Sequence, residues 1–302
     1  MITIDLHCDL LWYLSEKGIE AFTEASGAQI TKESWERGGP DLLVMAIYVD
    51  ERHIPHQKEA QALKMAGIYW NLAGTGCYTP VLQRKDLDMP GKKALLSIEG
   101  GAPLESEEDL YAFRALGVRM LSLCWNYQNH LATGCLEQYS GGLTLKGETL
   151  LKKAQDLGIL LDVSHLSEGS FWDAVKVSRL PLIASHSNSY ALKPHPRNLK
   201  DDAIKEIAKS GGVIGVNFCP GFLQNPSAPG VVEQVVYMAE LVGPEYVGIG
   251  SDFLGIDNTV QGLEHIGRWM DLEHLLEKAG FAKAEREGIL GGNFKRVLSE
   301  VL

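Results

Sequence analysis

Several features that would narrow the class of this protein are absent from its sequence. The five cysteines are odd in number and form no Cys-x-x-Cys pair, which argues against a disulfide framework and against a thiolate zinc site. The first residues contain neither the basic nor the apolar region of a signal peptide, and no apolar run approaches the roughly 20 residues that span a bilayer. We therefore expect a cytoplasmic protein without a membrane segment.

An excess of positive charge is also missing. The 302 residues carry a formal net charge of -11, which repels a phosphate backbone, so we expect no nucleic-acid partner. Hydrophobic residues make up 45% and charged residues 22%, a composition typical of a globular chain. A single (β/α)8 barrel takes about 250 residues, and we predict one catalytic domain over residues 1–302.

Short apolar runs alternate with longer helical segments, and no linker separates them. The runs are nearly all apolar, as in strands buried on both faces of a sheet. Strands are predicted over residues 2–6, 42–49, 94–98, 118–123, 159–163, 182–184, 213–217 and 247–249. Helices are predicted over residues 59–72, 107–116, 149–157, 167–177, 201–209 and 232–242. Gly117, Gly158 and Gly243 follow helices, where a left-handed cap is expected.

Eight strands that alternate with helices predict an α/β fold with a parallel sheet and right-handed crossovers. Closure into a (β/α)8 or TIM barrel is favoured, and an open doubly wound sheet is the alternative. No Gly-x-Gly-x-x-Gly follows the first strand, which weakens a dinucleotide-binding interpretation.

Reactive side chains follow several of the predicted strands. They are His7, Asp9, Glu99, His165, His186 and Asp252. In a barrel the carboxyl ends of all strands lie on one face, which holds the active site. Imidazole and carboxylate groups are costly to bury unless they are paired or bind a metal, so we predict one shared site. Asp50 and Asn217 also follow strands and could line the same pocket.

Each residue also has a simpler explanation. Side chains alternate along a strand, so His7 and Asp9 point to one side and could form half of a zinc shell, although an isolated His-x-Asp is more often a structural pair. Glu99, followed by two glycines, could bridge two metals or form a salt bridge at the rim. Asp252 could transfer a proton or cap a helix. Arg197, in a loop that contains proline, could bind a substrate carboxylate or lie at the surface.

The combined set is more specific than any member. His165 and His186 occupy equivalent positions of successive strands, whose ends lie only about 5 Å apart. Three histidines, two or three carboxylates and no thiolate suit two zinc ions or similar divalent metals. Two metals that share a carboxylate and a hydroxide support hydrolysis at neutral pH, because their charge lowers the pKa of the bridging water. The pattern therefore predicts a metal-dependent hydrolase.

The ordered motifs resemble the renal (membrane) dipeptidase family over nearly the whole chain. The matching segments are Asp5-Leu6-His7-Cys8-Asp9, Glu99-Gly100-Gly101, Leu161-Asp162-Val163-Ser164-His165, Ser185-His186-Ser187, Arg197-Asn198, Gly250-Ser251-Asp252 and residues 291–297. The resemblance implies a barrel of the metallo-dependent hydrolase type that cleaves dipeptides and often accepts a D-residue at the C-terminal position.

The resemblance also implies a binuclear zinc site. His7 and Asp9 would bind one ion. His165 and His186 would bind the other, and Glu99 would bridge them. A hydroxide that bridges the two ions would attack the peptide bond.

For the substrate, the resemblance implies that Arg197 holds its carboxylate and that Asp252 transfers protons. One position departs from the family. A substrate-contacting histidine is expected at the end of the fourth strand, where this chain has Trp125. An indole can donate a hydrogen bond but cannot accept a proton. Asn126 or His130 could supply the missing polar group.

Three functions fit the sequence. The first is a metallodipeptidase with a small dipeptide as substrate. The second is an amidohydrolase that acts on a non-peptide amide or lactam, and a requirement for a free α-carboxylate would separate the two. The third is a catalytically inactive metal-binding protein, suggested by Trp125 but opposed by Asp252, which a structural site does not need. The sequence contains no signal of oligomeric state, and a homodimer is compatible with it.

Overall fold

The computed structural model describes residues 2–24, 27–49 and 55–302. Within these residues nine strands form one sheet. The strands are β1 (Ile4–Cys8), β2 (Leu42–Tyr48), β3 (Thr79–Pro80), β4 (Lys93–Glu99), β5 (Val118–Leu121), β6 (Leu160–Leu161), β7 (Ile183–Ala184), β8 (Val213–Val216) and β9 (Val247–Ile249). The eight predicted strands each overlap one of them, and β3 was not predicted.

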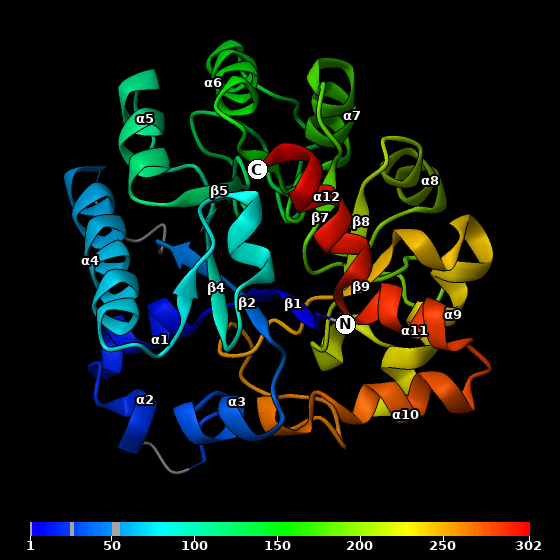
Figure 1. The fold of residues 1–302 in the computed structure, drawn as a ribbon. Coiled ribbons are helices and arrows are strands. Elements are labelled where there is room, and N and C mark those ends of the chain that lie inside the picture. Colours follow the sequence, from blue (N-terminus) through cyan, green and yellow to red (C-terminus); the bar gives the residue numbers. More distant parts are fainter. Residues whose placement is uncertain (1, 25–26, 50–54) are drawn as a thin grey trace.

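The strands close into a barrel. Their order is β6-β5-β4-β2-β1-β9-β8-β7, every neighbouring pair is parallel, and β3 pairs with the start of β4. A parallel bridge between Asp162 and Ile183 joins the two ends of this order. Helices surround the strands (Figure 1). The predicted (β/α)8 barrel is confirmed, and the open doubly wound sheet is excluded.

All six predicted helices are present. They are α4 (Pro55–Gly74), α5 (Glu107–Ala115), α6 (Leu145–Asp156), α7 (Glu168–Val177), α8 (Asp201–Lys209) and α9 (Ala228–Val242). Three of them, α4, α6 and α9, begin four residues earlier than predicted. For α6 and α9 the start is set by Thr144 and Ser227, whose side chains cap the helix by accepting a hydrogen bond from a backbone N–H of the first turn. Gly117, Gly158 and Gly243 all have positive φ, of 110°, 67° and 103°. At Gly243 ψ is 145°, so this residue ends α9 in an extended conformation and not in the predicted αL cap.

Further helices were not predicted. Before β2 lie α1 (Leu10–Lys17), α2 (Ala21–Glu24) and α3 (Lys32–Gly38), and after β9 lie α10 (Asp271–Lys278), α11 (Lys283–Glu287) and α12 (Asn293–Val301). Single turns are η1 (Arg84–Asp88), η2 (Pro220–Phe222), η3 (Pro244–Tyr246), η4 (Ile266–Arg268) and the π-type η5 (Gly288–Gly292). No helix in the described part of the chain is long and apolar enough to cross a membrane.

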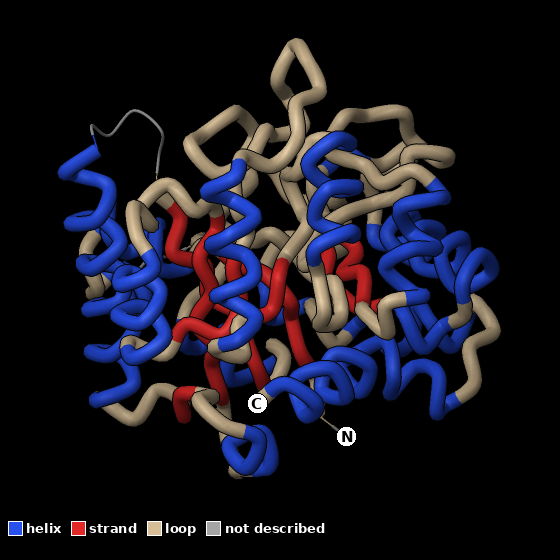
Figure 2. The backbone as a smooth tube through the Cα atoms, turned by 90° about the horizontal axis from the view of Figure 1, so that it is seen from above, coloured by secondary structure: helices blue, strands red, loops and turns tan. Residues whose placement is uncertain are grey.

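The interior of the barrel is closed at the amino ends of its strands. One buried cluster contains the first residues of β1, β2, β6, β7 and β8, together with Phe294, Val297 and Leu298 of α12. A larger cluster packs the outer faces of the strands against the surrounding helices. Long loops gather at the end of the barrel away from the chain's C-terminus (Figure 2). The carboxyl ends of the strands are thus left open for a site.

Candidate active site

The reactive side chains predicted to share a site lie together at the carboxyl ends of the strands. Glu99 is the last residue of β4, and His7 lies inside β1 rather than after it, because β1 extends to Cys8. The others lie in the loops that follow β1, β6, β7 and β9, and they are Asp9, His165, His186 and Asp252. All six side chains are buried.

Three histidine rings converge on one oxygen of Glu99. Its Oε1 lies 2.8 Å from Nε2 of His165 and 3.4 Å from Nε2 of His186. Nε2 of His7 lies 3.6 Å from the same oxygen. The Nε2 atoms of His165 and His186 are themselves 2.8 Å apart. Nitrogen atoms that crowd around a shared carboxylate in this way are typical of ligands around a cation.

His7 and Asp9 point to the same side, while Cys8 packs into the core. Nε2 of His7 is 3.3 Å from Oδ2 of Asp9, and one oxygen of Asp252 completes a group whose ligand atoms lie within 4.8 Å of one another. Among the described residues, neither ring nitrogen of His7 has a hydrogen-bond partner. Because such buried nitrogens are costly, the surroundings of His7 fit a metal ion that takes its lone pair.

The protonation of the histidines also suits metal binding. Burial lowers the pKa of His165 and His186 well below the usual value, and the positive charges of Arg197 and His7 lower both further. These two rings are therefore neutral at pH 7, as metal ligands must be. For His7, burial lowers the pKa, but the negative charge of Glu99 and other carboxylates outweighs it and raises the pKa to about 10. A cation of higher charge would replace that proton.

Two carboxyl groups of the site are strongly desolvated. Burial raises the pKa of Glu99 well above its usual range, and burial raises the pKa of Asp252 to about 6. The ligand atoms of Glu99, His165 and His186 all lie within 4.8 Å of one another. They form a second group beside that of His7, Asp9 and Asp252. Nitrogen and oxygen donors without thiolate suit zinc and similar ions. The buried clusters are consistent with metal binding.

Two of these residues, His165 and Asp252, have an unusual backbone conformation, and the side chain of each contacts an asparagine. His165 and Asp252 have φ of 71° and 62°, a left-handed conformation that is rare outside glycine. Oδ1 of Asn126 lies 2.8 Å from Nδ1 of His165. Nδ2 of Asn217 donates to Oδ2 of Asp252 at 2.9 Å, so Asn217 contacts the site through Asp252. Asp50, the other expected pocket residue, lies outside the described residues.

Arg197 is a buried cation at the edge of the cluster, with 5% of its surface exposed. Its Nη2 lies 3.2 Å from Nε2 of His165 and donates to the carbonyl oxygen of His186 at 3.3 Å. Its guanidinium carbon lies 5.6 Å from the centre of the Phe222 ring. These contacts fix the guanidinium at the wall of the cleft.

A cleft of about 510 Å³ opens above the cluster. Its lining includes Trp12, Tyr48 and Trp125. Trp12 lies in α1, Tyr48 is the last residue of β2, and Trp125 lies in the loop after β5. The ring of Trp125 lies 5.3 Å from that of Tyr48 and 5.9 Å from that of His165. Arg197, Phe222 and residues 255–258 line other parts. The cleft is therefore lined by both aromatic and charged side chains.

The structure does not bring His130 to this cleft. Its Nε2 lies 2.8 Å from the carbonyl oxygen of Leu104 and 3.9 Å from Glu105. Asn126 does line the cleft, but its side-chain oxygen contacts His165. His130 is therefore not among the residues that line the cleft, whereas Asn126 and Trp125 are.

Sequence reasoning missed several residues around the site. The aromatic side chains of Trp12, Tyr48 and Phe222 line the cleft, and no motif distinguishes them from core aromatics. Asp162 and Ser185 form a hydrogen-bond chain to His186. The signal for Asp162 was an acidic residue inside an apolar strand run, which is costly unless it has a partner.

A (β/α)8 barrel with buried imidazole and carboxylate groups at the carboxyl ends of its strands belongs to the metallo-dependent, amidohydrolase-like hydrolases. Within that class, the family model described as membrane dipeptidase (peptidase family M19) matches residues 1–302. The chain belongs to this family.

Curated relatives agree with this assignment. A dipeptidase of Aspergillus oryzae is 33% identical over 221 residues, which cover 70% of this chain and 52% of the relative. An uncharacterized dipeptidase of Schizosaccharomyces pombe is 32% identical over 219 residues, which cover 68% and 53%. A Klebsiella pneumoniae protein is 35% identical over 218 residues, which cover 68% and 80%. The chain thus spans about half the length of the two fungal relatives.

Solved structures share the whole fold. The dipeptidase AC, a metallopeptidase of family M19, is 25% identical with a TM-score of 0.90, and the match covers 100% of this chain and 98% of the other. A metallopeptidase of Rhodobacter sphaeroides has a TM-score of 0.91 at 24% identity, with 100% and 99% covered. That protein was solved with a phosphinate mimic of the dipeptide L-Ala-D-Ala.

Proposed function

We propose that this chain is a metal-dependent dipeptidase that also accepts substrates with a C-terminal D-residue. The observation that carries the proposal is the convergence of three histidine Nε2 atoms on Oε1 of Glu99, at 2.8–3.6 Å, beside a buried arginine. Membership of family M19 supports it, and so does the dipeptide mimic bound to the Rhodobacter sphaeroides protein. Residues 1–302 would act as one catalytic domain.

Five side chains would hold two divalent ions, for which zinc suits the donors best. His7 and Asp9 would bind one ion, His165 and His186 the other, and Glu99 would be shared. Divalent ions held by these residues would supply Lewis-acid chemistry and would make a water molecule acidic enough to act as the nucleophile at neutral pH. The burial of all five groups supports this assignment, because burial excludes competing water.

Two further residues would act on the substrate itself. Arg197 would bind the terminal carboxylate, since a buried guanidinium offers a charged fork with few competing partners. Asp252 lines the cleft beside His7 and Asp9. It would take the proton of the attacking water and pass it to the leaving amine, while Asn217 orients its carboxylate.

The position of Arg197 would set the direction of the substrate. If the C-terminal carboxylate lies at Arg197, the N-terminal residue would extend toward Tyr48 and Trp125, which line the same cleft. Their rings would favour an aromatic or large apolar side chain. Trp125 cannot take over proton chemistry from the family histidine, so its indole N–H would only donate to the substrate.

Hydrolysis of a panel of L-X-L-Y and L-X-D-Y dipeptides by the zinc-loaded protein tests the proposal. We expect turnover of free dipeptides and little turnover of the corresponding dipeptide amides. The amidohydrolase alternative predicts that amides are cleaved equally well. A zinc-loaded protein that cleaves neither kind would be the inactive metal-binding homologue, and the dipeptidase proposal would be abandoned.

A further inference from the structure

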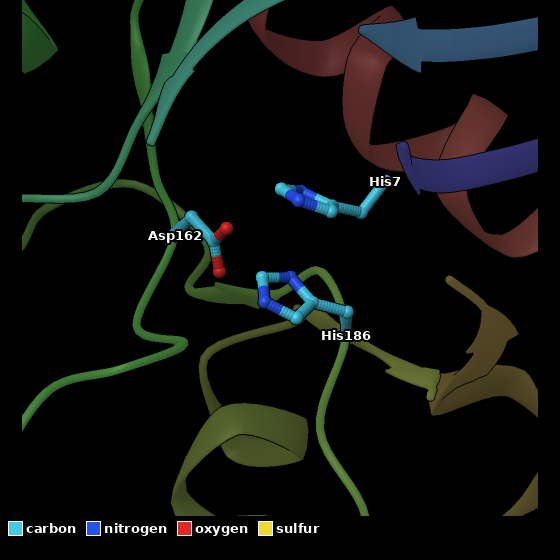
Figure 3. A group of neighbouring side chains, drawn as sticks. All are labelled: His7, Asp162 and His186. Carbon is cyan, nitrogen blue, oxygen red and sulfur yellow. The ribbon is translucent and has the colours of Figure 1, made fainter. Parts of the chain in front are cut away.

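A buried carboxylate that the proposed mechanism does not use lies next to two of the proposed metal ligands. Asp162 directly follows β6, and its side chain points toward the rings of His7 and His186 (Figure 3). The ligand atoms of these three residues lie within 4.8 Å of one another. Asp162 could therefore be a metal ligand, or it could support one.

The hydrogen bonds of Asp162 distinguish these roles. Its Oδ1 accepts from the backbone N–H of Ser164 at 3.0 Å and of Ser185 at 2.9 Å. Its Oδ2 accepts from the hydroxyl of Ser185. Three donors thus occupy the carboxylate, and two of them are backbone groups that cannot turn away. Asp162 is held as an acceptor within the protein rather than offered to an ion.

The same bonds determine where the proton of His186 sits. Ser185 Oγ lies 2.7 Å from Nδ1 of His186. The hydroxyl has one hydrogen, and it is donated to the carboxylate of Asp162, so toward His186 the oxygen can only accept. Nδ1 of His186 must then carry the hydrogen. Its Nε2 is left with a free lone pair, and this is the atom that lies 3.4 Å from Oε1 of Glu99.

We propose that Asp162 and Ser185 are positioning residues that act as a relay, fixing His186 in the tautomer with a free Nε2 and so raising the affinity of the metal site. The inference rests on the proposed metal site. His165 has a comparable support, since Oδ1 of Asn126 lies 2.8 Å from its Nδ1. For His7 the described residues provide no such partner. His165 therefore has one direct partner, whereas His186 is held through a serine hydroxyl that is itself bonded to a buried carboxylate.

Two substitutions separate a relay from a merely structural role. Ser185→Ala removes the hydroxyl oxygen that accepts from Nδ1 of His186, so that neither tautomer of this ring is favoured by a hydrogen bond at Nδ1. Asp162→Asn keeps the size and the two backbone bonds, but its amide N–H₂ donates to Ser185, whose hydroxyl then donates to Nδ1 and places the hydrogen on Nε2. Asp162→Asn should therefore be the more harmful change, although it is nearly isosteric. Ser97→Ala is the matched control, because Ser97 is a buried serine of β4 outside the relay.

Zinc affinity is measured on the full chain by competition with a chromogenic chelator, and thermal midpoints are measured in excess chelator. Loss of a supporting partner typically weakens metal binding about 10- to 100-fold, so we expect about 10-fold for Ser185→Ala and about 100-fold for Asp162→Asn. Ser97→Ala should bind zinc as the wild type does. In chelator, Ser185→Ala and Ser97→Ala should melt within a few degrees of each other, because each loses one buried hydroxyl.

Zinc affinities of both relay variants equal to that of the wild type would overturn the relay and leave the dipeptidase proposal intact. A greater loss in Ser185→Ala than in Asp162→Asn would also overturn it, since the order follows from the direction of the bonds. If Asp162→Asn does not fold, the test rests on the zinc affinities of Ser185→Ala and Ser97→Ala. Equal affinities of these two variants would refute the relay. A wild-type chain that binds no zinc would refute the relay and the metal site together.

Discussion

Arg197 is the residue on which the choice between a dipeptide and another amide depends. Its guanidinium is held at the wall of the cleft by the carbonyl oxygen of His186 and by the ring of Phe222. Because only 5% of the surface of Arg197 is exposed, a substrate carboxylate that binds to it must lose most of its hydration. Burying a carboxylate without a partner is costly, so Arg197→Ala should penalise substrates that carry one.

The size of the penalty follows from the lost bond. A hydrogen bond to a charged group contributes about 1.5–3 kcal/mol, which corresponds to a roughly ten- to hundred-fold rise in KM for free dipeptides. Arg197→Lys keeps the charge but loses the planar fork, so it should fall between the wild type and Arg197→Ala. A dipeptide amide lacks the carboxylate, and its weak cleavage should hardly change in either variant.

The assay compares kcat and KM for a free dipeptide and its amide in wild type and variants. Because Arg197 also contacts His165, metal content is measured for each preparation. Arg119→Ala serves as the control. Arg119 is another buried arginine, lies in β5, and donates to the carbonyl oxygens of Leu82 and Val118. It should lower stability without a selective rise in KM. If the wild type cleaves the amide as well as the free acid, Arg197 is not a carboxylate clamp.

Three further predictions concern the metals and the aromatic wall. Elemental analysis of zinc-replete protein should find about two ions per chain, because five ligand groups exceed what one catalytic zinc takes from a protein; one ion or fewer would contradict the binuclear site. Glu99→Gln should weaken both sites and remove nearly all turnover, and a variant with wild-type kcat would rule out a bridging role. Trp125→Ala should lower kcat/KM about ten-fold for dipeptides with an N-terminal Phe but little for those with Ala. An equal loss for both would make Trp125 a structural residue.

The barrel could be predicted because its strands are buried on both faces and therefore appear as separate apolar runs. The missed helices α1, α2, α3 and α11 contain only four to eight residues, too few for a helical period to be recognised. Strand β3 is two residues long and depends on its pairing with β4 rather than on its own sequence. Length does not explain every outcome, because the missed α12 has nine residues, as many as the predicted α5 and α8.

The candidate ligands could be predicted for a related reason. Barrel topology brings the carboxyl ends of all strands to one face. Once the barrel is predicted, histidines and carboxylates at these ends are therefore predicted to lie near one another. The supports of these ligands carry no comparable signal. Asn126 contacts His165 across 39 residues, and Asp162 contacts Ser185 across 23. Such pairs depend on the register of neighbouring strands, which the sequence of one chain does not reveal.

Backbone conformation at two site residues shows how far the site depends on the whole fold. Left-handed φ values at His165 and Asp252 each cost about 1–3 kcal/mol relative to an ordinary conformation. Distant segments offset that cost, because Cys135 N–H donates to the carbonyl oxygen of His165 at 2.8 Å and Asp252 N–H donates to that of His7 at 3.1 Å. Glycine would relieve the strain at either position but would remove the functional side chain. The chain therefore keeps a histidine and an aspartate where local propensity favours neither, and the assembled barrel supplies the free energy that holds them.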